Sequence, residues 1–264
     1  MISSRQAAII KKDIISVVSN KSMLTGLIVV PLVFTVVIPI IFILALHFAP
    51  DQLDDIESVI ELLPASMVFD DINRTFLMFL IDYVMPIFFI MIPVMASTIM
   101  AASSFVGEKE KRTLETLLYS PLSLPQIYQA KVWASFFLSM ALTVASFIVM
   151  LIAVETSLLL TTGSMILPGM IWAVTMLVVS PTTSLLAITF IVMGSAKAKT
   201  MEDAQQRAVI FIFPILFLVA GQFSGVFLIN AWIYLIGGAI FGVVSYFMMK
   251  RSMRSFTYEK LLRS

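Results

Sequence analysis

The chain alternates between six long apolar segments and shorter polar ones. An α-helix rises about 1.5 Å per residue and the hydrocarbon core of a bilayer is about 30 Å thick, so each apolar segment is long enough to cross a membrane. The pattern predicts an all-α integral membrane protein with a single transmembrane domain over residues 1–264. Its six transmembrane helices are predicted at residues 23–49, 75–106, 132–154, 165–196, 208–228 and 229–249, the last two joined by a short hairpin near residues 221–225.

The lysines and arginines lie almost entirely on one side of these spans. Sixteen of the 17 precede span 1 or follow span 2, 4 or 6, and only Arg74 falls in a segment assigned to the other side. Because cytoplasmic loops retain cations, this distribution predicts a multi-pass plasma-membrane protein with both termini in the cytoplasm. Residues 51–71 then form an external acidic loop, which a solvated surface explains better than a calcium site because no calcium-loop spacing is present.

Two further segments are predicted to lie on the cytoplasmic side, outside the spans. Residues 4–20 are predicted to form an interfacial helix, with one apolar stripe at Ala7, Ile10, Ile14, Val17 and Val18. The opposite, polar face of that helix would carry Arg5, Lys12, Asp13, Ser16 and Ser19. The tail, residues 250–264, is basic with interleaved apolar residues, and three positions remain open for it: anionic lipid, a partner protein or solvent.

The most informative polar segment, residues 107–123, lies between spans 2 and 3. Opposite charges stand four residues apart at Glu108 and Arg112 and again at Lys111 and Glu115, and leucines recur at helical spacing at positions 114, 117 and 118. Pro121 ends the pattern. The segment is therefore predicted to be a short amphipathic helix. Exposed leucines gain nothing unless they are covered, so this face docks on a partner or packs beneath the spans.

The run Gly-Glu-Lys-Glu-Lys-Arg-Thr-Leu-Glu-Thr-Leu-Leu-Tyr-Ser-Pro at residues 107–121 resembles the signature of the membrane subunits of ABC-2 type transporters. Many members of that family have glycine where this chain has Arg112. The resemblance implies that the segment is a coupling helix that contacts a separate ATPase subunit. The residues to which it assigns this contact are Glu108, Lys109, Glu110, Lys111, Arg112, Thr113, Leu114, Glu115, Leu117, Leu118, Tyr119 and Ser120.

The same resemblance covers the interfacial helix and all six spans, and it implies an assembly. Two copies of this permease would pair with two copies of the ATPase, which would bind the ATP and magnesium that this chain does not hold. Spans 2 and 5 would line a central pathway at the permease dimer interface, although lipid-facing aromatic residues give the same pattern. The candidate lining residues are Phe79, Asp82, Tyr83, Phe89, Phe213, Phe217, Gln222 and Phe223.

Composition limits the chemistry that this chain can perform. Hydrophobic residues make up 60% of it and charged residues 12%, which excludes an ordinary soluble domain, and the net charge of +1 gives no reason to expect nucleic-acid binding. The chain has no cysteine, one histidine, and no phosphate-binding, zinc-protease or nucleophile-elbow motif. It is therefore predicted not to be an enzyme, and no catalytic, cofactor-binding or metal-binding residue is assigned.

The cargo is less constrained than the fold. A pathway with few charges suits an amphipathic peptide or a hydrophobic drug, which is the predicted substrate class. Asp82, Glu155 and His47 are ionisable, but they fall near the outer ends of their spans, which disfavours ion coupling. The alternatives left open are the permease of an ATP-driven sodium exporter, a carrier that works alone on an ion gradient, and a membrane scaffold or sensor that transports nothing.

Prolines inside the spans predict interruptions of the helices. Span 2 contains Pro86 and Pro93, and Pro181 stands near the middle of span 4 within a Ser-Pro-Thr-Thr-Ser run. Proline lacks the backbone N–H, and neighbouring hydroxyls can satisfy the carbonyls that it leaves free. Span 4 is therefore expected to bend here. The bend serves either as a hinge on the pathway or, as the favoured interpretation, as a kink tolerated because it packs against a neighbouring helix.

Overall fold

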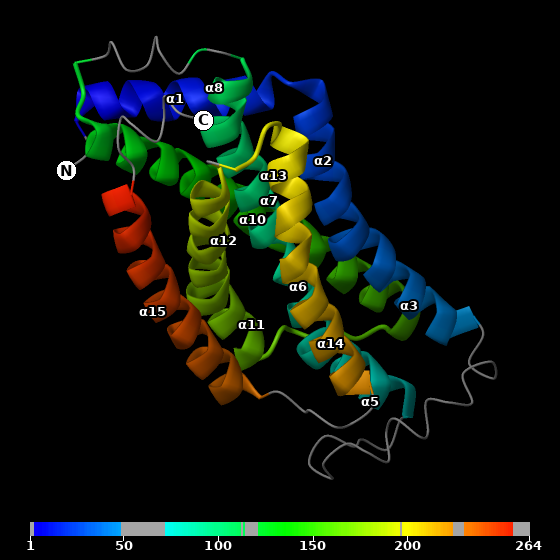
Figure 1. Ribbon diagram of the computed structural model, residues 1–264. Helices are drawn as coiled ribbons and strands as arrows, with labels where there is room; N and C mark the ends of the chain where they lie inside the picture. The colour runs from blue at the N-terminus through cyan, green and yellow to red at the C-terminus, as the bar shows by residue number, and fades with distance from the viewer. Residues whose placement is uncertain are drawn as a thin grey trace.

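The computed structural model describes residues 3–48, 72–111, 113, 121–195, 197–223 and 230–255 (Figure 1). All regular structure in these ranges is helical, and the prediction of an all-α protein with six spans is confirmed. The acidic loop at residues 51–71 and most of the basic tail lie outside the described residues. Of the hairpin predicted near residues 221–225, residues 221–223 form the end of α14 and the rest lie outside the described residues. The helical runs long and apolar enough to cross a membrane are Lys21–Phe48, Asn73–Glu110, Leu124–Thr162, Met170–Gly194, Met201–Gln222 and Ala231–Met253.

In the first, second and fourth runs short π-helical turns (η1, η4, η5 and η6) join α-helices end to end; the fifth contains a 3-10 turn (η7), and the third and sixth are each a single α-helix. The elements, in chain order, are α1 (Ser4–Val18), α2 (Lys21–Leu32), η1 (Val33–Val37), α3 (Ile38–Phe48), α5 (Ile72–Phe79), η4 (Leu80–Val84), α6 (Met85–Phe89), α7 (Met91–Ala101), η5 (Ala102–Val106), α8 (Gly107–Glu110), α10 (Leu124–Thr162), α11 (Met170–Val174), η6 (Thr175–Val179), α12 (Ser180–Gly194), α13 (Met201–Ala208), η7 (Val209–Phe211), α14 (Ile212–Phe223) and α15 (Ala231–Ser255).

The second run forms the centre of the bundle. In its most apolar window 72% of the residues are buried, whereas the corresponding figure for the last run is 17%. Its helix α7 packs against α10, α12 and α2, and its helix α6 packs against α14. α15 lies at the edge, where it packs chiefly on α12 (Figure 1). A large apolar surface of α14 and α15 therefore stays exposed in the single chain.

The elements outside the spans gather at one end of the bundle. Figure 1 shows α1 lying across this end, close to α8 and to the beginning of α10, and the end of α15 that carries Lys250 and Arg251 lies at the same end of the bundle. α13 lies at the same end, whereas α5, which carries Arg74, lies at the opposite end. The fold thus separates the cations of the described residues as the sequence predicted. That the end with α1 faces the cytoplasm stays a prediction.

The third run is longer than its apolar core. α10 covers 39 residues, about 58 Å of helix, against about 30 Å of hydrocarbon. It begins before the predicted span 132–154 because Ser123 and Gln126 form a capping box. It ends after that span, where Gly163 adopts a left-handed conformation with a φ of 67°. α10 therefore extends beyond the predicted span at both ends, and its first two turns lie at the end of the bundle where α1 lies.

Three prolines each stand two residues after a π turn. Pro39 follows η1, Pro86 follows η4 and Pro181 follows η6. In each case the residue just before the proline donates its N–H to the carbonyl five residues earlier, as Ser180 does to Thr175. The proline itself has no N–H to give to the carbonyl four residues back, so the ladder changes register ahead of it. The predicted interruptions at Pro86 and Pro181 therefore take the form of π turns, whereas Pro93 lies in α7, which a turn at Ile90 separates from α6.

Hydroxyl groups near Pro181 join helices as well as satisfying carbonyls. Thr182 and Thr183 donate to the carbonyls of Val178 and Val179 at 2.8 and 2.7 Å. The hydroxyl of Ser184 lies 2.6 Å from that of Ser97 and 2.8 Å from that of Ser139, and it thereby connects α12 to α7 and α10. The polar run in span 4 is packed against its neighbours, in agreement with the favoured interpretation.

Two glycines allow α15 to approach α12 closely. A Cβ added at Gly238 would lie 2.9 Å from Val178 Cγ1, and one added at Gly242 would lie 3.1 Å from Thr182 Cγ2. The two glycines are four residues apart, as in the small-residue motifs that let membrane helices pack backbone to backbone. This contact fixes the position of α15 against η6 and α12.

We predict that Gly238→Val destabilises the protein by about 1–3 kcal/mol, because the added methyl groups would overlap Val178 and Val179. Gly237→Val is the matched control, since nothing lies within 4 Å of a Cβ at that neighbouring position. Thermal unfolding of the detergent-solubilised chain compares the two variants. Equal unfolding temperatures would show that close approach of α15 to α12 does not depend on the small residue.

Candidate functional site

The first residues of the predicted coupling segment continue span 2. Gly107–Glu110 forms α8, the last turn of the helical run that begins at the opposite end of the bundle, rather than the first turn of a separate helix. The chain then turns at Lys111, and Thr113 donates its N–H to the carbonyl of Glu108 at 2.9 Å. The remaining predicted contact residues lie outside the described residues, namely Arg112, Leu114, Glu115, Leu117, Leu118, Tyr119 and Ser120.

Four ionised side chains meet at α8 and form what we term the ion cluster: Lys12, Asp13, Glu108 and Lys131. Lys131 Nζ lies 2.8 Å from Glu108 Oε2 and 3.6 Å from Asp13 Oδ2. Lys12 Nζ lies 3.2 Å from Asp13 Oδ1 and also pairs with Glu108 Oε1. The cluster thus joins α1, α8 and α10, three elements that are far apart in the sequence.

Most of the ion cluster is withdrawn from water. The side chains of Lys131, Asp13 and Glu108 are 2%, 4% and 8% exposed, whereas that of Lys12 is 54% exposed. Burying a charge is costly unless it is paired, and here two ammonium groups face two carboxylates. Partial burial lowers the pKa of Lys12, but its hydrogen bond to Glu108 and the charge of Asp13 outweigh this and raise the pKa above its ordinary value.

The π turn η5 supplies further partners for the ion cluster. Ser104 donates its hydroxyl to Asp13 Oδ2, and its backbone carbonyl accepts from Lys131 Nζ. The Lys131 ammonium also lies 5.5 Å from the centre of the Phe105 ring. The buried ammonium therefore has carboxylate, carbonyl and aromatic partners, and η5 is held to α1 and α10 together with α8.

The ion cluster is not among the predictions from the sequence. Asp13 was predicted on the polar face of the interfacial helix, but the buried residues of α1 are Gln6, Ile9, Asp13 and Val17. The prediction for Asp13 is wrong because α1 packs on α10, and that contact, rather than a membrane surface, selects the buried face. The predicted spans place Lys131 in the cationic segment between spans 2 and 3, whereas it stands two turns inside α10 between two apolar residues. A lone lysine in that setting was the available signal.

On its other side α8 contacts α13. Glu110 Oε2 accepts from the backbone N–H of Met201 at 3.0 Å, and Lys109 Nζ donates to the carbonyl of Ala198 at 3.4 Å. Gly107 is also close, since a Cβ there would lie 2.9 Å from Met201 Sδ. α13 continues through η7 into α14, the fifth span. The beginning of the predicted coupling segment is therefore bonded to α1 and α10 on one side and to the head of span 5 on the other.

The predicted pathway residues do not share one surface in the single chain. Phe79 and Phe89 are each 2% exposed and belong to the core, where Phe89 packs edge-on against Trp172 with ring centres 5.4 Å apart. Phe213 and Phe217 on α14 are 68% and 64% exposed. The side chain of Phe223 lies outside the described residues. Of the aromatic candidates whose side chains are described, those on α14 face outward.

The polar pathway candidates connect spans to one another. Asp82 Oδ1 accepts from the backbone N–H of Gly169 at 2.8 Å, which joins η4 to the beginning of α11. Gln222 is 1% exposed, and its Nε2 donates to the carbonyl of Tyr83 at 3.2 Å. Span 5 is therefore bonded to span 2 at the end of the bundle opposite α1 (Figure 1).

We predict that Lys131→Met lowers the stability of the protein by about 3–5 kcal/mol, because two carboxylates would then face the single ammonium of Lys12. Adding Glu108→Gln removes one carboxylate, balances the charges again and is expected to recover part of the loss. Lys11→Met, at an exposed position of α1, is the control and should change stability by no more than about 0.5 kcal/mol. Unfolding of the solubilised variants by heat measures all three. A Lys131→Met protein as stable as the control would contradict the ion pairing.

Comparison with known protein families identifies the family of this chain. A family model described as ABC-2 type transporter matches residues 6–227, a range that runs from α1 to beyond α14 and includes every residue of the ion cluster. A comparison with curated proteins finds no match. The six helices able to span a membrane within the described part of the chain agree with a permease. The chain therefore belongs to the ABC-2 type transporter family and is a multi-pass membrane permease.

Proposed function

We propose that this permease forms the transmembrane pathway of an ATP-driven exporter. Two copies pair with two copies of a separate ATPase subunit, which binds ATP and magnesium and contacts residues 108–120 of this chain. Closure of the ATPase subunits around ATP displaces these segments and rearranges spans 2 and 5 of the two permeases, so that access to the pathway alternates between the two sides of the membrane.

One observation carries this proposal beyond membership of the family. The segment to which the resemblance assigns the ATPase contact begins at α8, where Glu108 pairs with Lys12 and Lys131 and where Glu110 accepts from the backbone of Met201. A force applied to residues 108–120 would therefore act at once on α1, on α10 and on α13. Because α13 continues into span 5, the force has a short covalent route to the predicted pathway helix.

The surface of α14 supports a permease dimer through span 5. Phe213 and Phe217 would remain covered by lipid or by a second copy, and two copies meeting here would place four aromatic rings along a shared path. A path lined by aromatic and aliphatic groups suits an amphipathic peptide or a hydrophobic drug. We therefore propose that class as the exported substrate.

The proposed ATPase contact predicts the behaviour of the three leucines at positions 114, 117 and 118. Replacing all three with aspartate is expected to abolish co-purification of the ATPase subunit and transport-linked ATP hydrolysis, because each leucine buried at a contact contributes about 1.5–3 kcal/mol. Replacing all three with methionine keeps the apolar volume and should preserve both. Co-purification followed by ATP hydrolysis in proteoliposomes provides the measurement. Normal assembly of the aspartate variant would refute the docking role.

The proposed dimer can be tested by crosslinking, because the natural chain contains no cysteine. Cysteine introduced singly at Phe213 or Phe217 is expected to give crosslinked dimers in native membranes when a short bismaleimide is added. Cysteine at Ile240, which is 56% exposed on α15, is the control and should remain monomeric. Dimers that form from position 240 and not from the two α14 positions would place the interface on the last span and contradict the proposal.

A further inference from the structure

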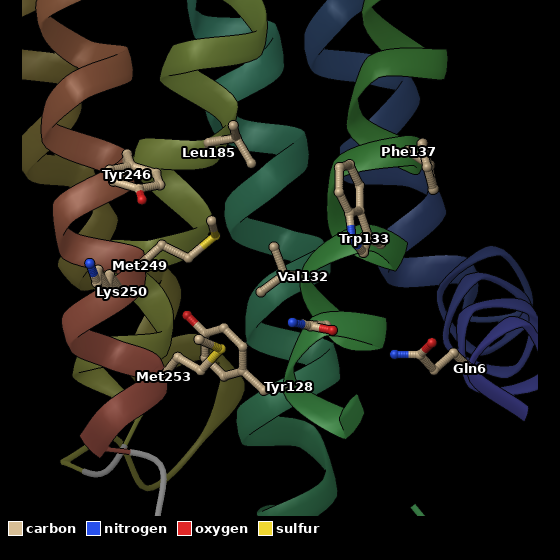
Figure 2. Close-up of a pocket in the computed structure, with 11 residues that line it drawn as sticks. Gln6, Tyr128, Val132, Trp133, Phe137, Leu185, Tyr246, Met249, Lys250 and Met253 are labelled. Atoms are coloured by element: carbon tan, nitrogen blue, oxygen red, sulfur yellow. The ribbon is translucent and has the colours of Figure 1, made fainter. Parts of the chain in front are cut away.

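A cavity of about 620 Å³ lies between α10 and α15, with α12 behind it and α1 at its edge (Figure 2). Both α10 and α15 pack on α12, and the glycines of α15 that touch η6 and α12 lie earlier along α15 than the cavity. The wall on α15 is formed by Tyr246, Met249, Lys250 and Met253, which continue the same helical stripe. Its volume falls within the range of about 300–1,000 Å³ typical of sites for small molecules.

The cavity opens on the outer, lipid-facing surface of the helix bundle. Trp133, Phe137 and Tyr246 line it and are 41%, 43% and 56% exposed. All three lie on helices long and apolar enough to cross a membrane, so these rings and the mouth of the cavity meet lipid rather than bulk water. Figure 2 shows Trp133 and Phe137 on α10 and Tyr246 on α15, on opposite sides of the opening.

The polar side chains that line the cavity lie near the C-terminal end of α15 and near the beginning of α10. Lys250 stands one turn after Tyr246, and Gln129 stands one turn before Trp133 on the facing helix. No acidic side chain lines the cavity among the described residues, so its charge is that of the Lys250 ammonium. A cation with tryptophan and tyrosine above an apolar wall is the arrangement found at the headgroup level of a membrane.

We propose that this cavity binds a phospholipid with an anionic headgroup, drawn from the leaflet at the end of the bundle that carries α1. The headgroup phosphate pairs with Lys250 and accepts from Gln129, and an acyl chain lies along Val132, Phe137 and Met249. Basic pockets between membrane helices are known to bind anionic lipid headgroups. The site lies on α10 and α15, away from α14, and it does not depend on the proposed export function.

Quenching of tryptophan fluorescence by brominated lipid tests the proposal on the full chain. Vesicles of phosphatidylcholine receive the same minor fraction of brominated phosphatidylglycerol or brominated phosphatidylcholine. The signal of Trp133 is taken as the difference between the chain and its Trp133→Phe variant, which leaves the other tryptophans in place. We expect Trp133 to prefer the anionic lipid about fivefold, the ratio set by one cation near an anionic headgroup.

Two single substitutions on α15 distinguish specific lipid binding in the cavity from nonspecific attraction of anionic lipid to a basic surface. Lys250→Gln removes the cation that lines the cavity and should abolish the preference. Arg251→Gln removes an exposed cation one residue away that does not line it, and should retain the preference. Equal quenching by the two lipids in the unchanged chain, or a preference that survives Lys250→Gln, would overturn the proposal. Loss of the preference in both variants would also overturn it, because surface charge alone would then account for it.

Discussion

The pairing of Lys131 with Glu108 and Asp13 is the constraint on which the architecture at the α1 end depends. Because these charges are buried, any movement that separates them would expose an uncompensated charge to a medium of low polarity. α1, α8 and α10 must therefore move together or exchange partners completely. Lys12, which remains half exposed, is the member that can contact water while still pairing with both carboxylates. A displacement of α8 is therefore passed on to α1 and α10 through the ion cluster.

The spans could be predicted from hydropathy because each membrane helix must satisfy the same requirement independently of its neighbours. A helix in hydrocarbon must be apolar along its own length, so six spans and the separation of cations could be predicted without knowing which helix touches which. The ion cluster could not be predicted in this way. Asp13 and Lys131 are 118 residues apart, and a helical wheel of either segment shows a charge without its partner. Asp13 was assigned to a polar face because the wheel cannot distinguish water from a buried ammonium.

The positions of two helix interruptions were predicted correctly from the prolines, but the π-helical geometry of these interruptions was not predicted. Pro86 and Pro181 do interrupt their helices, since each lacks the donor that an α-helix needs. The sequence does not reveal that the ladder changes register one turn earlier, in η4 and η6, where side chains then take new directions. In η4 this places Asp82 within 2.8 Å of the Gly169 amide. A residue first considered for its charge therefore serves as the bond between the second and fourth spans.

Some of the candidate pathway residues are buried in the core and others are exposed. One sequence alone does not distinguish the two, because burial depends on which helices pack together. Phe79 and Phe89 fill the core of a single chain, while Phe213 and Phe217 face outward, although all four are phenylalanines in apolar helices. Only the outward pair can meet a second copy without unpacking the core. α14 is bonded to span 2 through Gln222 and continues from α13, whose first amide contacts Glu110. The outward face of span 5 thus lies at the end of a continuous route from α8, whereas the buried phenylalanines would move only if the core itself rearranged.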